Sequence, residues 1–167
     1  TKAVFYQNHS ESQGYRNHSK YKQQVFNARV WHDLSDSSQI RWQFNYTDSP
    51  YAYDAGGINL DMVKENAKQA RPQNETYNTY ETINHLKTGL QWEKQINDNL
   101  RWDSYAFYAH RDFVGRLPFE FGGFVDLKRD YYGLGTKYSK QFFLDNKSRT
   151  ITLGVDHSNQ QDDRKRF

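Results

Sequence analysis

The eight residues Ile40-Arg41-Trp42-Gln43-Phe44-Asn45-Tyr46-Thr47 decide the fold class. Every second side chain in this stretch is apolar or aromatic, and the side chains between them are hydrophilic. Side chains of a β-strand point alternately to the two faces of a sheet. The stretch therefore predicts a strand with one apolar face and one polar face.

The same alternation recurs along the chain. It is found near residues 26–34, 86–93, 100–111, 132–141 and 151–156, and residues 3–15 are also expected to be extended. His32 lies on the apolar side of its segment, and Tyr105 and Phe107 place rings on the polar side of theirs. The sequence thus predicts an all-β, mainly antiparallel chain of about seven strands, each about ten residues long or more.

The connections between these strands alternate in length. Ser35-Asp36-Ser37-Ser38, Asn97-Asp98-Asn99 and Asp145-Asn146-Lys147-Ser148 are turn-forming residues at the length of a turn. The long connections cover roughly residues 48–78 and 113–130, with a polar one near 16–21. Short periplasmic turns and long extracellular loops are typical of transmembrane β-barrels, whose tilted strands need about ten residues to cross a bilayer. A soluble antiparallel sheet with one packed face would show the same alternation, but has no reason to segregate its loops.

The composition is polar and yet rich in rings. The 167 residues are 35% hydrophobic, and they include 13 Tyr, 11 Phe and 4 Trp. Ordinary soluble domains contain more aliphatic residues, whereas a barrel wall turns its apolar face to lipid and needs no compact core. Rings at strand ends are expected to form the interfacial girdles of such a wall, namely Tyr46, Trp92, Trp102 and Tyr138.

The sequence gives little support for catalysis or for binding of nucleic acid. The net charge of +3 is too balanced for a nucleic-acid-binding protein, and a chain without cysteine has no thiol nucleophile or Cys-ligated zinc. The six histidines lack the spacing of a zinc-binding pair, and no nucleophile–base pair is evident. Residues 133–137 look like a phosphate loop, but they lack its spacing and lie in a predicted strand. We therefore expect no enzyme, cofactor or metal site.

The first long connection contains a predicted helix over residues 59–70. Asn59 or Asp61 can cap its start, and Arg71-Pro72 is expected to end it. Gly56-Gly57, which precedes the helix, predicts a flexible turn.

Two segments resemble TonB-dependent outer-membrane receptors. Gly14-Tyr15-Arg16-Asn17-His18-Ser19, followed by Gln24-Val25-Phe26, is similar to a "DGYRDHS" segment that leads into a strand in that family. The loop from Gly57 to Asn74 is similar to the family's "G-L-T-x-x-Q-V … R-Q-A-x-P-x-N" loop. The chain departs from these patterns at Gln13, where the family usually has Asp, and at Asn59, where Thr is common. The resemblance covers about the first half of the chain, and the second half agrees only in its pattern of strands and turns.

The resemblance implies a barrel of 22 strands with an N-terminal plug. Residues 1–167 would then be part of the barrel domain alone, with the plug absent. Such receptors bind a scarce nutrient outside the cell, most often a ferric siderophore, and import it with energy that TonB delivers through the plug. We therefore expect an integral protein of the outer membrane of a Gram-negative bacterium. Its partners would be a ferric siderophore or other metal chelate, its own plug and remaining strands, TonB through the missing plug, and outer-membrane lipid.

Two further features predict that the chain is a piece of a larger barrel. Seven strands is an odd number, whereas bacterial single-chain barrels have even numbers. Phe167 has polar neighbours on its own side of the chain, and residues 160–166 are expected to begin an extracellular loop.

Two long connections combine arginines with rings. Such side chains suit an anionic ferric chelate through charge-assisted hydrogen bonds and ring contacts. The alternative is that the rings only pack the loops on one another. The candidate ligand-binding residues are Arg111, Phe113, Arg116, Phe119, Tyr51, Tyr53 and Arg71.

Two other interpretations remain open. A small complete outer-membrane barrel of about eight strands, with an adhesive or structural role, fits the length, although the odd strand number and the long first loop count against it. A soluble, aromatic-rich β-domain that binds glycans would show the same alternation of apolar and polar side chains. Dependence on detergent would distinguish both barrels from it.

Overall fold

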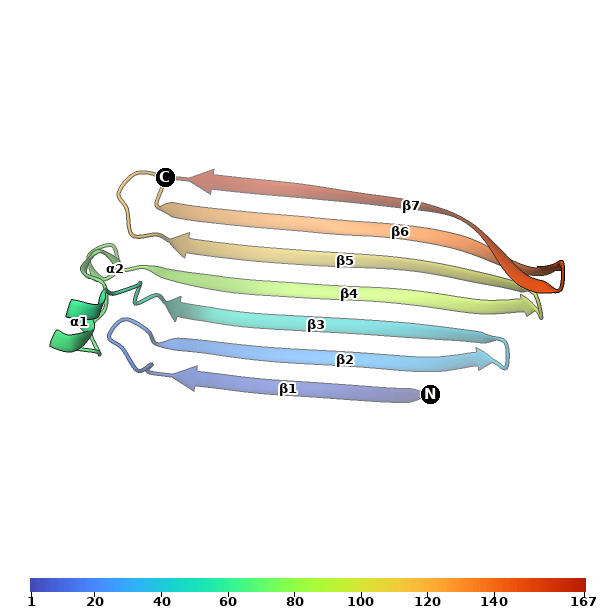
Figure 1. Ribbon diagram of the computed structural model, residues 1–167, viewed down its shortest axis with the longest axis horizontal. Coiled ribbons are helices and arrows are strands. Elements are labelled where there is room, and N and C mark those ends of the chain that lie inside the picture. The colour runs from blue at the N-terminus through green and yellow to red at the C-terminus, as the bar shows by residue number, and fades with distance from the viewer.

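Seven antiparallel strands form a single sheet in the computed structural model, which describes all residues from Thr1 to Phe167. Each strand pairs with its neighbours in the chain, in the order β1 to β7 (Figure 1). The prediction of an antiparallel all-β chain with seven strands is confirmed. The strands are β1 (Lys2–Ser12), β2 (Tyr21–Ser35), β3 (Ser38–Tyr53), β4 (Tyr80–Asn97), β5 (Leu100–Arg116), β6 (Phe124–Leu144) and β7 (Lys147–Arg166).

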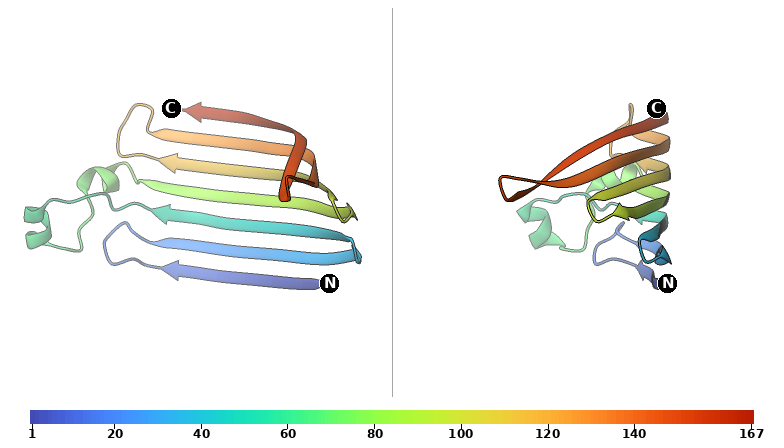
Figure 2. Two further views of the ribbon diagram at one scale, coloured as in Figure 1. Left: turned by 45° about the vertical axis from the view of Figure 1, so that its right-hand side comes forward. Right: turned by 90° about the vertical axis from the view of Figure 1, so that its right-hand side faces the viewer.

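The sheet is open. Its strand order begins at β1 and ends at β7, and no pairing joins these two strands. β1 and β7 form the two opposite edges of the sheet. Figure 2 shows the β6–β7 hairpin bending away from the other strands at its turn. One edge of β1 and one edge of β7 therefore present unpaired backbone groups.

The connections are segregated by length, as predicted. Two-residue turns at 36–37, 98–99 and 145–146 lie at one end of the sheet, and the longer connections lie at the other end (Figure 1). Asp145 and Asn146 have φ angles of 52° and 59°. Two successive positive φ angles are typical of the type I′ turn, whose twist matches that of the strands it joins.

Two of the three longer loops are shorter than the sequence predicts, whereas the one predicted near residues 16–21 is longer and covers 13–20. The first one covers residues 54–79 rather than 48–78, and the second covers 117–123 rather than 113–130, because β5 and β6 continue to Arg116 and from Phe124. Residues 160–166 belong to β7 and pair with β6 as far as Val125↔Arg166, so the expected loop there is wrong. The strands are longer than predicted because backbone hydrogen bonds between neighbouring strands continue past the residues whose side chains alternate clearly.

Two short helices lie in the loop 54–79. α1 (Leu60–Glu65) begins as predicted, because the side chain of Asn59 accepts a hydrogen bond from the Met62 backbone N–H at 2.9 Å. The helix ends at Glu65, well before the expected end. Pro72, which was expected only to end that helix, instead begins α2 (Pro72–Thr76), where the missing N–H of proline costs no hydrogen bond. Neither helix has the length and apolar character needed to cross a membrane.

The two faces of the sheet differ in chemistry. We call the side that carries Trp42 and Phe44 the aromatic face, and the side that carries Arg41, Gln43 and Asn45 the polar face. The antiparallel register sets residues of one face opposite residues of the same face on the next strand. The aromatic and polar rows therefore continue across the sheet.

The aromatic face is not covered by a second layer. Only 12 of the 167 residues are buried, and just four of these are hydrophobic. On β7, the aromatic-face residues Ile151, Leu153 and Val155 are 55%, 74% and 67% exposed. The sheet therefore has no compact core between packed layers.

Rings cluster on the aromatic face near the turn end. The ring centroids of Trp92 and Trp102 are 4.6 Å apart, and those of Trp102 and Tyr138 are 5.2 Å apart. Trp102 Nε1 also donates a hydrogen bond to the Thr136 hydroxyl at 2.7 Å. Tyr46 lies near the middle of β3, opposite Leu86, so three of the four predicted girdle residues lie near the turns and one lies nearer the loops.

The division between the faces weakens at β7. His157 and Asn159 pair with Leu134 and Tyr132, and so place polar groups on the aromatic face. Asn159 Nδ2 donates to the Tyr132 hydroxyl at 3.1 Å, which satisfies part of its hydrogen-bonding capacity.

Candidate functional site

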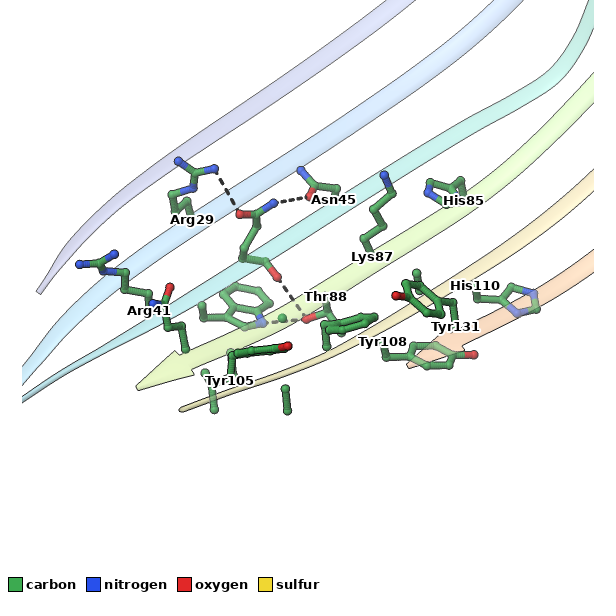
Figure 3. Close-up of a pocket in the computed structure, with 18 of the residues that line it drawn as sticks. Arg29, Arg41, Asn45, His85, Lys87, Thr88, Tyr105, Tyr108, His110 and Tyr131 are labelled. Atoms are coloured by element: carbon green, nitrogen blue, oxygen red, sulfur yellow. Dashed lines mark hydrogen bonds between the residues drawn. The ribbon is translucent and has the colours of Figure 1, made fainter. Parts of the chain in front are cut away.

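A hollow of about 760 Å³ lies against the middle of the sheet, and most of the strands contribute to it (Figure 3). Its lining includes rings such as Tyr105, Phe107 and Tyr131, and it contains no Asp or Glu. Five permanently cationic side chains line it, namely Arg29, Arg41, Lys87, Arg111 and Arg129.

The strand register gathers these cations on the polar face. Arg111 on β5 lies opposite His85 on β4 and opposite Arg129 on β6. Arg129 is held by two hydrogen bonds to Asp162 on β7, at 2.7 and 2.6 Å. Arg111 has no ion pair; its guanidinium lies 5.3 Å from the centre of the Phe113 ring, and its buried Nε has no partner. Arg111 is therefore the arginine of this row whose charge no carboxylate matches, and all its N–H donors are left for a ligand.

Glycines on the polar face of β6 make room for the neighbouring rings. A Cβ at Gly133 would lie 2.7 Å from the Phe107 ring, and one at Gly135 would lie 2.6 Å from the Tyr105 ring. The Tyr105 hydroxyl reaches across β6 to donate to Asp156 at 2.5 Å. Residues 133–137 thus lie in a strand, as predicted, and their glycines let rings lie flat against the wall.

Charge is balanced on the polar face near the turns and unbalanced in the hollow. Near the turns, Glu93 contacts Arg41 at 3.0 Å and Arg101 at 2.9 Å, and Arg101 contacts Asp103 at 2.7 Å. Asp103 is only 5% exposed, so its charge is matched inside the network. Of the five cations that line the hollow, Arg29, Lys87 and Arg111 form no ion pair. These unpaired charges make the middle of the polar face attractive to anions.

The sequence-based list of candidates missed most of the cations of the hollow. Arg29, Arg41, Lys87 and Arg129 occupy polar positions of alternating segments, and each segment alone appears as an ordinary solvated face. The strand register could have identified these cations, because a hairpin turn fixes which polar residues of two strands lie opposite one another.

The seven predicted ligand-binding residues do not converge on one site. Arg111 and Phe113 share the polar face of β5, and Arg111 is the one of the seven that lines the hollow. Arg116 is five residues further along the same strand and so lies on the opposite side. Its guanidinium is 5.6 Å from the ring of Tyr77 in the loop 54–79.

The other candidates lie at the loop end of the sheet. Tyr53 pairs with Tyr80 and therefore lies on the same side as Arg116; its ring centroid is 6.1 Å from that of Tyr51. Phe119 is in the loop 117–123, and Arg71 directly precedes α2 with its Nε donating to Gln73 at 3.1 Å. Ligand binding by these residues stays a prediction, and the structure divides them into a polar-face pair and a loop-end group.

An ion pair joins β1 to β2 at the loop end. Lys22 Nζ lies 3.5 Å from Glu11, and the Tyr51 hydroxyl donates to the same carboxylate at 3.2 Å. The charge of Lys22, and then the hydrogen bond from Tyr51, lower the pKa of Glu11 below its ordinary value. The contact of Tyr51 is therefore with an edge strand of the sheet and not with the hollow.

The fold is similar to part of a transporter of known structure. No family model matches the sequence. The crystal structure of the ferric citrate transporter FecA in its unliganded form matches 99% of this chain, with a TM-score of 0.78 and 16% sequence identity. The chain spans about a quarter of that protein, since the match covers 25% of it. The prediction of a segment of a receptor-type β-barrel is thus confirmed at the level of the fold.

Proposed function

We propose that this chain is a segment of the barrel wall of a TonB-dependent outer-membrane receptor, which imports a ferric siderophore or a similar metal chelate. The observation that carries the proposal is the uncovered aromatic face, with a cluster of rings near its turn end and Tyr46 nearer the loops. A soluble sheet buries such a face against a second layer, whereas a barrel wall turns it to lipid. The likeness to part of the FecA barrel supports this choice.

The chemistry along the aromatic face supports one orientation of the wall in the membrane. Asp48, Asn84 and Asp112 lie side by side on this face, just beyond Tyr46 toward the loops. Such a polar row does not suit hydrocarbon, so lipid contact ends near Tyr46. The longer loops then lie outside the cell and the two-residue turns face the periplasm.

The polar face supports transport of an anion. In a closed barrel this face surrounds the lumen, where the cations of the hollow would attract a negatively charged chelate. Arg111 can donate to carboxylate or hydroxamate oxygens, and Phe113 beside it can contact an aromatic group. The free edges of β1 and β7 would pair with the remaining strands of the barrel. TonB would act through the plug that such a barrel encloses.

Fractionation of cells that express the complete parent gene tests the membrane assignment. We expect the protein in the outer membrane, resistant to extraction by high salt and released only by detergent. A protein recovered in the soluble fraction would contradict the proposal and favour the glycan-binding domain.

Iron uptake tests the transport assignment. Deletion of the gene should lower uptake of radioactive iron supplied as ferric citrate, a hydroxamate chelate or a catecholate chelate, and loss of TonB should abolish the same fraction. Uptake that is unchanged for all three chelate classes would contradict the transport function while leaving the membrane assignment intact.

A further inference from the structure

Two loops at the same end of the sheet are joined through one arginine. Figure 1 shows the loop 13–20 beside the loop 54–79, which contains α1 and α2. Arg16 donates from Nε to the carbonyl of Gln69 at 2.9 Å, from Nη1 to Gly56 at 2.6 Å and from Nη2 to Ala55 at 3.1 Å. The guanidinium thus holds the chain both before and after α1.

The loop 13–20 is shaped to present Arg16. Gly14 has a φ of +77°, and a side chain there would collide with Ser19. The Ser19 hydroxyl accepts from the Arg16 N–H at 3.2 Å and donates to the Arg16 carbonyl at 2.5 Å. The next residue, Asn17, donates its backbone N–H to the Lys68 carbonyl at 2.7 Å. Backbone and side chain therefore both fasten this loop to its neighbour.

The base of the loop 54–79 is closed by a second set of hydrogen bonds. Asn74, which is 1% exposed, donates to the backbone and side chain of Asp54 and to the Thr79 hydroxyl, each at 3.1 Å. His18 Nε2 lies 2.8 Å from the Thr79 carbonyl and so ties the loop 13–20 to the same point. Gly56, with a φ of +63°, leaves the space that the Asn74 side chain occupies.

The loop has little apolar packing to hold it in place. Ala55 and Ala70 are its only buried hydrophobic residues, and no residue of α1 is buried. Arg16 forms no ion pair, so its charge is matched by carbonyl groups alone. The three carbonyl oxygens accept from three different nitrogens of the planar guanidinium. The single nitrogen of a lysine ammonium group cannot reproduce this arrangement.

We propose that Arg16 is a positioning residue that clamps the loops 13–20 and 54–79 into one rigid body, so that the α1 segment does not open as a separate lid. This inference rests on contacts within this chain, so it does not depend on the proposed receptor function. It explains why the two segments that resemble the receptor family, far apart in sequence, meet in the structure.

Limited proteolysis of the complete gene product, in whichever cell fraction contains it, tests the clamp without any transported ligand. Lys64 and Lys68 are exposed trypsin sites in the clamped loop. Arg16→Lys keeps the charge and the trypsin site, and we expect cleavage after Lys64 at least tenfold faster than in the wild type. Arg71→Lys is the matched control, because that arginine lies on the same loop and its side chain donates a hydrogen bond only to Gln73, two residues away. Its cleavage rate should stay within twofold of the wild type.

Hydrogen exchange tests whether the two loops open together. The Asn17 amide, bonded to Lys68, and the Arg71 amide, bonded to Ala55, should exchange at rates within tenfold of each other. Both should accelerate at least tenfold in Arg16→Lys, while the central amides of β3 and β4 keep their rates, which excludes general unfolding. An Arg71 amide that exchanges more than tenfold faster than the Asn17 amide in the wild type, or equal rates in Arg16→Lys and wild type, would overturn the proposal.

Discussion

Arg111 and Arg116 are five residues apart on β5, and this odd spacing places them on opposite sides of the sheet. Arg111 contacts the Phe113 ring and lines the hollow, whereas Arg116 lies against Tyr77 at the loop end. Their sequence neighbourhood suggested one binding patch. Because side chains of a strand alternate between the two faces, the two arginines lie in different surroundings.

Replacement of each arginine should separate their roles. A hydrogen bond to a charged group is worth about 1.5–3 kcal/mol, so Arg111→Ala should weaken binding of an anionic chelate roughly ten- to hundredfold. Arg116→Ala should change it less than about threefold. Concentration-dependent iron uptake, compared at equal surface expression, measures both. Equal losses in the two variants would remove the distinction between the faces.

The ion pair of Glu11 predicts a dependence on pH at the edge of the sheet. The pKa of Glu11 is lowered by Lys22 and Tyr51, so the ionised carboxylate stabilises the folded β1–β2 end. This stabilisation is present above the ordinary pKa of 4.5 and is lost as the pH falls through the lower folded value. Amide exchange near Ser12, corrected for intrinsic rates, should therefore accelerate below that pH.

A matched pair of variants isolates this effect. Glu11→Gln should remove the acid-dependent part of the exchange, and Glu65→Gln, whose carboxylate has no ion pair, should leave it. An identical pH profile in Glu11→Gln and wild type would show that another group is responsible.

At the scale of elements, alternation predicted which strands exist, and backbone pairing decided how long they are. Residues 124–130 of β6 carry charges on both sides of the strand, so their pattern indicated a loop. Their ladder with β5, from Arg116↔Phe124 to His110↔Asp130, nevertheless continues without a break. The local sequence does not show where the partner strand ends. The predicted strand ends were therefore less accurate than the predicted strands themselves.

Neighbouring positions on β4 test the assignment of the two faces. Leu90 lies on the aromatic face and Gln91 on the polar face, where its side chain donates to Glu93 at 3.0 Å. A cation on the lipid side of a barrel near the middle of the bilayer costs about 2–4 kcal/mol, so Leu90→Lys should lower the amount of folded protein in the outer membrane. Gln91→Lys should be tolerated, because Glu93 can pair with the new charge.

The amounts of folded protein can be compared by the change in gel mobility that heating causes in folded barrels. Equal tolerance of both lysines would contradict a lipid contact on the aromatic face. Loss of both variants would instead mean that the strand is closely packed on its two sides.

At the scale of the molecule, the sheet has two free edges and one uncovered apolar face. A chain of this kind gains little from burial, since only 12 residues are buried. We therefore expect residues 1–167, produced alone without detergent, to aggregate or to lack a cooperative unfolding transition. Circular dichroism and sedimentation of the purified chain measure this. A cooperative thermal transition of a monomer in plain buffer would contradict the barrel-wall interpretation.

The sequence by itself determined that the chain is a sheet with one aromatic and one polar side. It did so because period-two alternation follows directly from the geometry of an extended backbone. The three short turns were equally local and equally predictable, and local sequence limited the helix cap to Asn59 or Asp61. Only the tertiary structure decided which cations share the hollow and which loops meet at Arg16, because both depend on register and on contacts between residues far apart in the chain. The fit of a guanidinium to three carbonyls has no signature in local sequence, since it exists only once the two loops lie side by side.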